Sequence, residues 1–343
     1  MKSTDKITKA NKILNVLIAV TAVLAVTAAA VAGVRNYSDS RKMDVSYGYQ
    51  PASYLTEDPV EKASSALAPA FADSLCVGQA NVALGEIALA DDEKGGLFQL
   101  DDREILYAKG LYDRIYPASI TKIMTSLLAI EHGTMDDVVT IQAQDVTLEE
   151  GSQMGGLQVG DVVTMDQLFH ALMVYSANDA AMAIARHIGG TVEQFVEMMN
   201  QEAQRLGMTG THFVNPHGLH NDDHYTTVYD IYLMLNTAFR EQKFAQTMSL
   251  ATYTLTVTAA DGSPRTRYLP ATDKYLTGEE TAPENVTVLG GKTGTTSQAG
   301  NCLALVSQNA YGEPYISIIV NAKNKTTLYS DMNTLLSQIN GAQ

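Results

Sequence analysis

Three short motifs stand far apart in this sequence, but their chemistry is useful only if the fold brings them together. Ser119–Lys122 (Ser-Ile-Thr-Lys) offers a hydroxyl and an amine, Ser176–Asn178 (Ser-Ala-Asn) a second hydroxyl and an amide, and Lys292–Gly294 (Lys-Thr-Gly) a second cation. A nucleophile, a base, a proton carrier and a cationic anchor are the parts needed for acyl transfer through a covalent seryl intermediate. The fold must therefore place these segments at one site.

The first motif opens a predicted helix. Pro117 precedes it, Gly133 ends the run, and the apolar positions between them are Ile120, Ile123, Met124, Leu127 and Leu128. This spacing predicts a buried helix. Residues three apart share a helix face, so the Lys122 amine can reach the Ser119 hydroxyl. The helix N-terminus also offers unpaired N–H groups where an oxyanion would form. A second Ser-x-x-Lys, Ser3–Lys6, has no such context.

The other two motifs also lie where their chemistry needs them. Thr164 and Gln167 predict a capping box that starts one helix, and a second helix is expected from about Asn178 to Ile188, stopping at Gly189-Gly190. Ser176 falls at the junction between them, whereas another Ser-x-Asn, Ser307–Asn309, ends an apolar run. Lys292–Gly294 follows two glycines and precedes strand-like runs, which predicts a strand at a sheet edge.

The order of the predicted elements indicates the fold class. Strand-like runs occur at 97–100 and 104–107, helical runs fill the middle, and strands return after about residue 286, including 302–306 and 315–320. Helices and strands segregated in this way favour an α+β fold over an alternating α/β fold. The 343 residues allow one large domain with appendages.

The segment Pro117–Thr125 resembles the active-site helix of the low-molecular-mass penicillin-binding proteins, and the chain is similar more narrowly to the serine D-alanyl-D-alanine carboxypeptidases (peptidase family S11). Further matching segments are Ser176–Ala181, Phe195–Asn200, Asn215–Leu219, His224–Thr227, Gly291–Thr295 and Ala299–Leu303. The resemblance implies a β-lactamase/transpeptidase-like fold. Such a fold has a five-stranded antiparallel sheet flanked by helices, a mainly helical subdomain, and the active site between them.

The resemblance also implies a catalytic role for four residues. Ser119 would attack the substrate carbonyl, and Lys122 would accept the serine proton as a neutral base. The pKa of Lys122 would be lowered by burial and by the charge of Lys292. Ser176 would pass the proton to the leaving amine, and Asn178 would position the peptide amide.

Substrate binding is implied for the third motif. Lys292 and Thr293 would meet the terminal carboxylate, beside Gly294 and Thr295. Backbone N–H groups of Ser119 and Thr295 would stabilise the oxyanion, and one such donor is worth roughly 3 kcal/mol in other enzymes. The implied reaction removes the terminal D-Ala from peptidoglycan stem pentapeptides through an acyl-enzyme, with β-lactam antibiotics as covalent inhibitors. No cofactor and no metal are expected.

The chain departs from the family pattern at three places. Ala177 stands where the family commonly has Gly, and Pro270–Lys274 replaces an Asn-x-Asn stretch. Many relatives carry an Arg after the last strand to bind the substrate carboxylate, where this chain has Leu328. Lys325 or Lys323 is the candidate substitute for that Arg.

The N-terminal region predicts membrane attachment. Residues 13–34 are uncharged and long enough to span a bilayer, and four lysines precede them. We expect a cytoplasmic basic tail at 1–12, a transmembrane signal-anchor at 13–34, a stalk at 35–79, and an extracytoplasmic penicillin-binding D,D-carboxypeptidase domain at 80–343. The alternative is a cleaved signal peptide, suggested by Ala28-x-Ala30, which would leave a secreted protein.

Composition limits the remaining classes of function. The net charge of −15 argues against nucleic acid as a partner, because nucleic-acid binding requires a basic patch. Cys76 and Cys302 can pair in an oxidising compartment, but a small buried hydrophobe is the favoured interpretation of Cys302. His217, His220 and His224 suggest a metal site, yet the residues between them predict a loop that puts no His pair on one helix face.

Two alternative functions stay open beside the carboxypeptidase. One is a β-lactamase of the same fold, although Glu197–Asn200 lacks the spacing of the Glu-x-x-Leu-Asn segment that a class A β-lactamase uses for deacylation. The other is an anchored penicillin-binding sensor or wall-binding protein with slow or no turnover. The complete set of motif residues speaks against an inactive site but does not exclude slow turnover.

Overall fold

The computed structural model describes residues 74–78, 81–85 and 87–340. The chain divides into two units, 1–67 and 68–343, and every described residue lies in the second. The predicted basic tail and the apolar segment 13–34 lie outside the described residues, as does most of the predicted stalk 35–79. Within the described ranges, no helix is long and apolar enough to cross a membrane.

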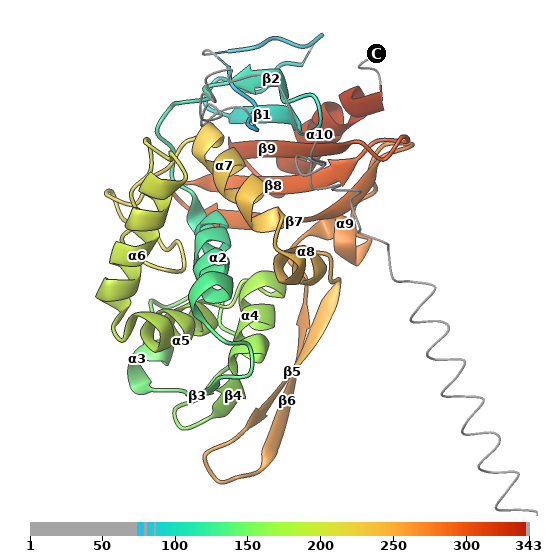
Figure 1. The fold of residues 1–343 in the computed structure, drawn as a ribbon. Coiled ribbons are helices and arrows are strands. Elements are labelled where there is room, and N and C mark those ends of the chain that lie inside the picture. The colour runs from blue at the N-terminus through green and yellow to red at the C-terminus, as the bar shows by residue number, and fades with distance from the viewer. Residues whose placement is uncertain (1–73, 79–80, 86, 341–343) are drawn as a thin grey trace, which may run out of the picture. The chain divides into compact units, whose positions relative to one another are not determined.

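Five strands form one antiparallel sheet in the order β2-β1-β9-β8-β7 (Figure 1). They are β1 (Lys94–Gln99), β2 (Glu104–Lys109), β7 (Thr287–Thr296), β8 (Gly300–Gln308) and β9 (Pro314–Ala322). Each strand predicted from the sequence overlaps one of these, and the Lys-Thr-Gly motif lies on the edge strand β7. The predicted α+β class with a five-stranded antiparallel sheet is confirmed.

Helices cover both faces of this sheet because its central strands are apolar on both sides. Leu97 of β1 lies in the apolar cluster formed with α10 (Lys325–Ser337). Its neighbour Phe98 points to the opposite face, as successive residues of a strand do, and stacks on Tyr232 of α7 (Val228–Phe239) with ring centroids 4.3 Å apart. The sheet is therefore held between α10 and α7.

A helical group faces the β7 edge of the sheet (Figure 1). Its helices are α2 (Lys122–His132), α3 (Ala143–Val146), α4 (Met165–Val174), α5 (Asn178–Gly189), α6 (Val192–Arg205) and α8 (Gln242–Met248). The first eight residues of α2 are all buried, so this helix is the centre of the group. The predicted junction at Ser176 is confirmed, since α4 ends at Val174 and α5 begins at Asn178.

The start of the first predicted helix differs from expectation. Ala118–Thr121 forms a 3₁₀ turn, and the α-helix begins only at Lys122. Ala118 has a positive φ of 48°, which is unfavourable for a residue with a side chain and incompatible with an α-helix at this point. Ser119 therefore lies in a tight turn in front of α2.

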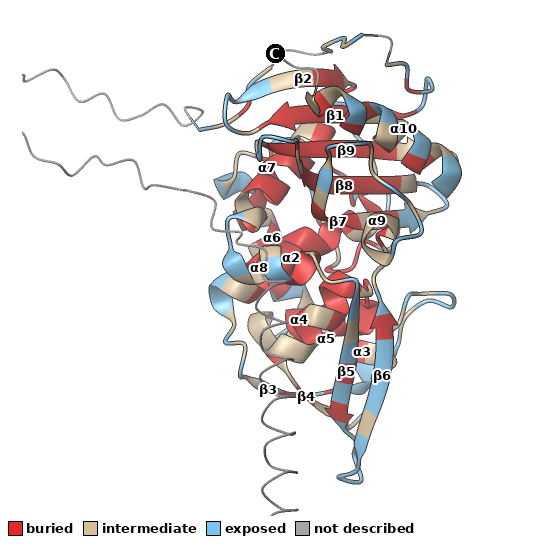
Figure 2. Cartoon of the chain, turned by 90° about the vertical axis from the view of Figure 1, so that its right-hand side faces the viewer, coloured by how far each residue is buried: buried red, intermediate tan, exposed pale blue. Residues whose placement is uncertain are grey.

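A second sheet, which the sequence did not predict, lies at the far side of the helical group. It contains β3 (Val138–Thr140), β4 (Val162–Thr164), β5 (Thr252–Thr258) and β6 (Pro264–Pro270), in that order. The β5–β6 hairpin extends along the helical group, and much of β6 is exposed (Figure 2). The two short strands have three residues each, which is too short to carry a recognisable alternation.

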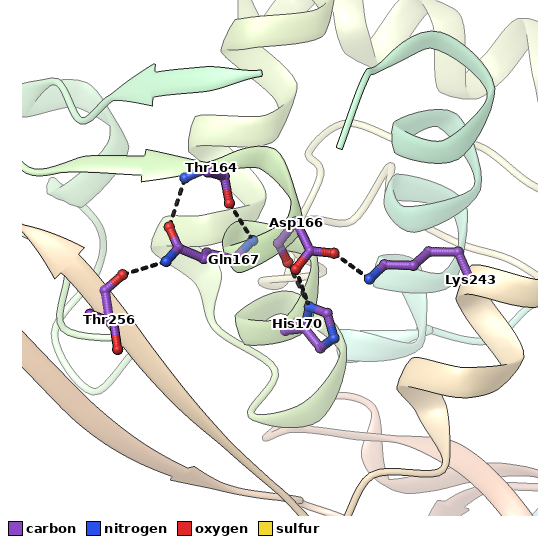
Figure 3. A network of polar contacts seen from close by, with 6 residues as sticks. All are labelled: Thr164, Asp166, Gln167, His170, Lys243 and Thr256. Carbon is purple, nitrogen blue, oxygen red and sulfur yellow. Dashed lines mark hydrogen bonds and ion pairs between the residues drawn. The ribbon is translucent and has the colours of Figure 1, made fainter. Parts of the chain in front are cut away.

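Polar contacts fix the start of α4, the helix that leads to Ser176 (Figure 3). The predicted capping box is present: Thr164 Oγ1 accepts from Gln167 N at 3.2 Å, and Gln167 Oε1 accepts from Thr164 N at 2.8 Å. Gln167 Nε2 also donates to the Thr256 carbonyl of β5 at 2.6 Å. Asp166 forms an ion pair with Lys243 of α8. These contacts hold α4 against both β5 and α8.

The two cysteines are free and buried. Cys76 Sγ donates to the Gln99 carbonyl and Cys302 Sγ to the Ala299 carbonyl, each at 3.3 Å. The pairing that the sequence left open is absent from the structure, and the favoured interpretation of Cys302 as a small buried side chain is confirmed.

Candidate active site

The structure brings the three motifs together around one cavity of about 170 Å³. Ser119 and Ser176 line the cavity with Thr293, Gly294 and Thr295 of β7. The remaining predicted site residues, which are Lys122, Asn178 and Lys292, are buried and hydrogen-bonded to this lining or to one another. All eight predicted site residues therefore belong to one connected arrangement.

Lys122 is the centre of that arrangement. Its Nζ lies 2.9 Å from Ser119 Oγ, 2.6 Å from Asn178 Oδ1 and 2.7 Å from the His217 carbonyl oxygen. Burial lowers the pKa of Lys122 well below its ordinary value, and the nearby charge of Lys292 lowers it further. A neutral amine has two N–H donors and one lone pair. It can donate to the amide and carbonyl oxygens and still accept a proton from the serine hydroxyl.

Lys292 holds the second hydroxyl. Its Nζ donates to Ser176 Oγ at 2.8 Å and to the Thr293 carbonyl at 3.0 Å. Burial lowers the pKa of Lys292 to about 7, against the opposing charge of Asp273. Ser176 has a positive φ of 65°, an uncommon conformation that costs energy in a residue with a side chain. This strained turn directs the Ser176 hydroxyl toward β7.

Two glycines allow backbone segments to press against the Ser119 turn. A Cβ on Gly218 would stand 1.9 Å from the Ala118 carbonyl oxygen, and Gly218 itself has a positive φ of 87°. A Cβ on Gly294 would come within 3.1 Å of Ser119 N. The segment around Gly218 and strand β7 therefore both approach the Ser119 turn closely.

The segment 215–218 supports the site in a way that sequence reasoning missed. Besides the His217 carbonyl at Lys122, the Pro216 carbonyl accepts from Thr125 Oγ1 at 2.5 Å. Asn215–Leu219 matched the family, but nothing in its side chains indicated that its carbonyl groups bind α2. The only available signal was the Pro-His-Gly sequence itself, which predicts a tight loop.

A second missed contact involves Asp179. Its carboxylate accepts from the backbone N–H groups of Gly155, Gly156 and Leu157 at 2.7, 3.0 and 3.1 Å. The N–H of Asn178 donates to the Gln153 carbonyl at 2.8 Å, and Gln153 lines the cavity. The segment 153–157 is thus fastened to the start of α5, and its first residue, Gln153, lines the cavity.

The cavity lining also includes Leu328, at the position where the family resemblance implied an Arg. Tyr329 lines the cavity too, together with Lys325 at the start of α10. Leu328 is only 2% exposed, so its side chain contributes an apolar wall. Of the two lysines considered as substitutes, Lys325 lines the cavity and is exposed, whereas Lys323 is not among the lining residues.

The histidines are engaged within the protein. His224 Nδ1 accepts from Val214 N at 3.1 Å, and its Nε2 lies 2.8 Å from Thr121 Oγ1. Burial lowers the pKa of His217 and of His224 to about 3. Among the described residues, no group of three His, Cys, Asp or Glu side chains is arranged to hold a metal ion.

Residues 97–324 match the D-alanyl-D-alanine carboxypeptidase family, peptidase family S11. The chain belongs to this family. It is 38% identical over 152 residues to D-alanyl-D-alanine carboxypeptidase DacF of Bacillus subtilis (strain 168), a match that covers 43% of this chain and 39% of the relative. It is also 28% identical over 242 residues to the D-alanyl-D-alanine carboxypeptidase of Streptomyces sp. (strain K15), covering 68% of this chain and 81% of the relative.

The crystal structure of the Streptomyces K15 DD-transpeptidase has the same fold, with a TM-score of 0.67 and 27% identity over 75% of this chain and 98% of that chain. The predicted β-lactamase/transpeptidase-like fold is thereby confirmed. The chain spans less than two fifths of the length of the first curated relatives, 39% and 35% for two of them. The comparisons do not favour a β-lactamase or a sensor.

Proposed function

We propose that the protein is a serine-type D-Ala-D-Ala carboxypeptidase that removes the terminal D-Ala from peptidoglycan stem pentapeptides and is acylated by β-lactam antibiotics. The observation that carries this proposal is the position of Lys122 Nζ, 2.9 Å from Ser119 Oγ and donating to two fixed acceptors. Burial lowers the pKa of this amine well below its ordinary value, which favours the neutral form that can take the serine proton.

In the acylation step, Ser119 Oγ attacks the carbonyl carbon of the penultimate D-Ala as its proton passes to Lys122 Nζ. The oxyanion forms beside the Ser119 N–H, which lies in the first turn of a helix and has no intrahelical acceptor. The Thr295 N–H is the proposed second donor. Preorganised donors of this kind stabilise the charge that develops in the transition state.

Departure of the terminal D-Ala requires a proton on its amine. Ser176 Oγ is the proposed carrier, since it lines the cavity and is held by Lys292 Nζ. The Ser176 proton goes to the leaving nitrogen, and the proton that Lys122 received restores the hydroxyl. Asn178, which binds Lys122 through Oδ1, orients the substrate amide. Water then attacks the acyl-enzyme and releases the shortened peptide and Ser119.

The leaving residue carries a free carboxylate, and Lys292 with Thr293 would bind it. Thr293 Oγ1 donates to Thr272 Oγ1 at 2.6 Å, and both threonines line the cavity. With Leu328 in place of an Arg, Lys325 is the cationic side chain among the lining residues. We propose Lys325 as a weaker, non-bidentate partner for the carboxylate.

The decisive experiment incubates the full chain in detergent with diacetyl-Lys-D-Ala-D-Ala and measures free D-Ala, with Ser119→Ala as the control. D-Ala release that depends on Ser119, with a penicillin adduct on the peptide containing Ser119, is the expected result. Penicillin acylation without D-Ala release would support the sensor instead, and rapid release of hydrolysed penicillin would support a β-lactamase. D-Ala release by Ser119→Ala contradicts the mechanism.

The solved neighbour is named a DD-transpeptidase, an enzyme that passes the acyl group to an amine instead of water. The same transfer is therefore a second outcome to test in this protein. Adding glycylglycine as acceptor to the same assay separates the two outcomes. Hydrolysis yields only the shortened peptide, whereas transpeptidation yields the peptide extended by the acceptor. We expect hydrolysis to predominate.

We further propose that residues 13–34 anchor the enzyme in the cell membrane with its catalytic domain outside the cytoplasm. The support is the uninterrupted, uncharged length of the segment, which exceeds a typical signal-peptide core. N-terminal sequencing of the mature protein tests this proposal. A mature N-terminus between Ala29 and Gly33, with the protein in the medium, would show cleavage and secretion.

A further inference from the structure

Asp273 is a buried carboxylate whose hydrogen-bonding capacity is mostly unused. The residue is 2% exposed and precedes the short helix α9 (Lys274–Thr277). Its Oδ1 accepts one hydrogen bond, from Tyr275 N at 3.0 Å, and its Oδ2 has no hydrogen-bond partner among the described residues. Burial of a carboxylate is costly unless hydrogen bonds or an opposite charge compensate it.

The opposite charge lies on β7. Thr272, the neighbour of Asp273, accepts from Thr293 Oγ1 at 2.6 Å, and its N–H donates to the Val174 carbonyl at the end of α4. These two bonds fasten the segment before α9 beside Lys292. Burial raises the pKa of Asp273 to about 6 and lowers that of Lys292 to about 7, and the charge of each residue opposes the shift of the other, so each stabilises the ionised form of the other.

The other groups around Asp273 are neutral or paired elsewhere. Tyr275 of α9 and Tyr329 of α10 face it as phenols, and their pKa values are raised by burial and by the charge of Asp273. Lys274 Nζ forms an ion pair with Glu280 at 3.6 Å. Lys292 is therefore the buried cation on which Asp273 acts.

Lys122 has a different electrostatic environment. The carboxylate that acts on it, Asp179, receives backbone N–H groups at both oxygens: Gly155 and Ala180 at Oδ1, Gly156 and Leu157 at Oδ2. These donors already compensate its negative charge. The carboxylates that act on the two buried lysines are thus unequal: Asp179 accepts from four backbone N–H groups, whereas Asp273 accepts from one and has Lys292 as its opposite charge.

Resting on the proposed function, we propose that Asp273 is a positioning residue that holds Lys292 in its charged form at neutral pH, so that Lys292 binds a substrate carboxylate while Lys122 stays neutral. Asp273 does not touch the substrate in this proposal. It acts through Lys292 alone, so its removal should shift the pH at which the acylation rate falls.

The test measures the rate of acylation by a fluorescent penicillin, which carries a carboxylate, from about pH 5.5 to about pH 9. The variants are Asp273→Asn and Asp273→Ser. Both remove the charge, and both keep an oxygen that can accept from Tyr275 N. The matched control is Glu284→Gln, which makes the same change in net charge at an exposed position.

The rate should fall at high pH as Lys292 loses its proton, and in both Asp273 variants this fall should begin about one pH unit lower, a loss of about tenfold at pH 7 to 8. Below about pH 6 the pKa of Asp273 leaves the wild-type carboxyl largely protonated, so variant and wild type should converge there. Glu284→Gln should follow the wild type.

A merely structural role would lower the rate by the same factor at every pH, and parallel curves for both variants would overturn the proposal. If the wild type itself forms no penicillin adduct, the proposed function fails first. If the wild type is acylated and the rate in Asp273→Asn and Asp273→Ser falls at the same pH as in the wild type, the proposed function stands and the role of Asp273 is rejected.

Discussion

Gly218 lies so close to Ala118 that a Cβ on residue 218 would stand 1.9 Å from the Ala118 carbonyl oxygen. Ala118 begins the turn that carries Ser119, and Gly218 follows the residue whose carbonyl binds Lys122. The proposed nucleophile Ser119 and its proposed base Lys122 are thus aligned partly by a backbone contact between two segments distant in sequence.

Gly218→Ala should therefore reduce both the stability of the protein and the rate of acylation. We expect the positive φ to cost about 1–3 kcal/mol of stability and the clash with the Ala118 carbonyl to cost about 1–3 kcal/mol more. Acylation should fall by about 100-fold, because small displacements of a nucleophile have large kinetic effects. Gly262→Ala is the matched control: Gly262 has a φ of 84° but nothing within 4 Å of its Cβ position. Equal acylation rates in the two variants would contradict this interpretation.

Lys122→Ala and Lys292→Ala should fail in different ways. Without the Lys122 amine no base remains beside Ser119, so penicillin acylation should be abolished. Without Lys292 the base is still present, and the expected losses are in carboxylate binding and in the positioning of Ser176. Acylation kinetics over a range of penicillin concentrations separate the two effects. Near-normal acylation of Lys122→Ala would require another base.

The carboxylate pocket predicts a modest preference for free-acid peptides. Lys325 is exposed and would bind a carboxylate only as a point charge, whereas an Arg binds a carboxylate through two hydrogen bonds. Leu328→Arg should raise the ratio of kcat/KM between a free-acid peptide and its C-terminal amide, and Lys325→Ala should lower it. A ratio that is already large and unaffected by either substitution would assign the role to another residue.

Buried histidines should destabilise the protein in acid. The pKa of His224 is about 3 in the fold, below the ordinary value of 6.5, so the unfolded chain binds more protons between these values. Stability should fall as pH drops below about 6.5, by about 2 kcal/mol from this group at pH 5. Unfolding by urea at about pH 7 and pH 5 measures the loss.

The loss between these pH values should shrink in His224→Gln, even though that variant is less stable at pH 7. His132→Gln, at an exposed position, serves as the control. A loss of the same size in His224→Gln and in the wild type would show that other groups cause the acid sensitivity.

Sequence reasoning succeeded where the signal was local. The capping box of Thr164 and Gln167 formed because its partners are three residues apart, and the Ser119–Lys122 pair met because three residues make nearly one helical turn. The strands of the main sheet were recognisable from their continuous apolar runs. The short strands β3 and β4 could not be recognised, because three residues are too few to show an alternating pattern.

The composition of the site beyond its motifs was decided by tertiary structure. The His217 carbonyl that binds Lys122 comes from 95 residues away, and every residue has such a carbonyl group, so no side-chain pattern indicates it. Asp179 and Asp273 also differ in the number of backbone N–H groups that they accept, and nothing in the sequence indicates this difference. The sequence determined which reactive groups the chain carries. Burial, and the backbone groups that the fold brings to each side chain, decided how far the pKa of each lysine falls and how many hydrogen bonds each carboxylate accepts.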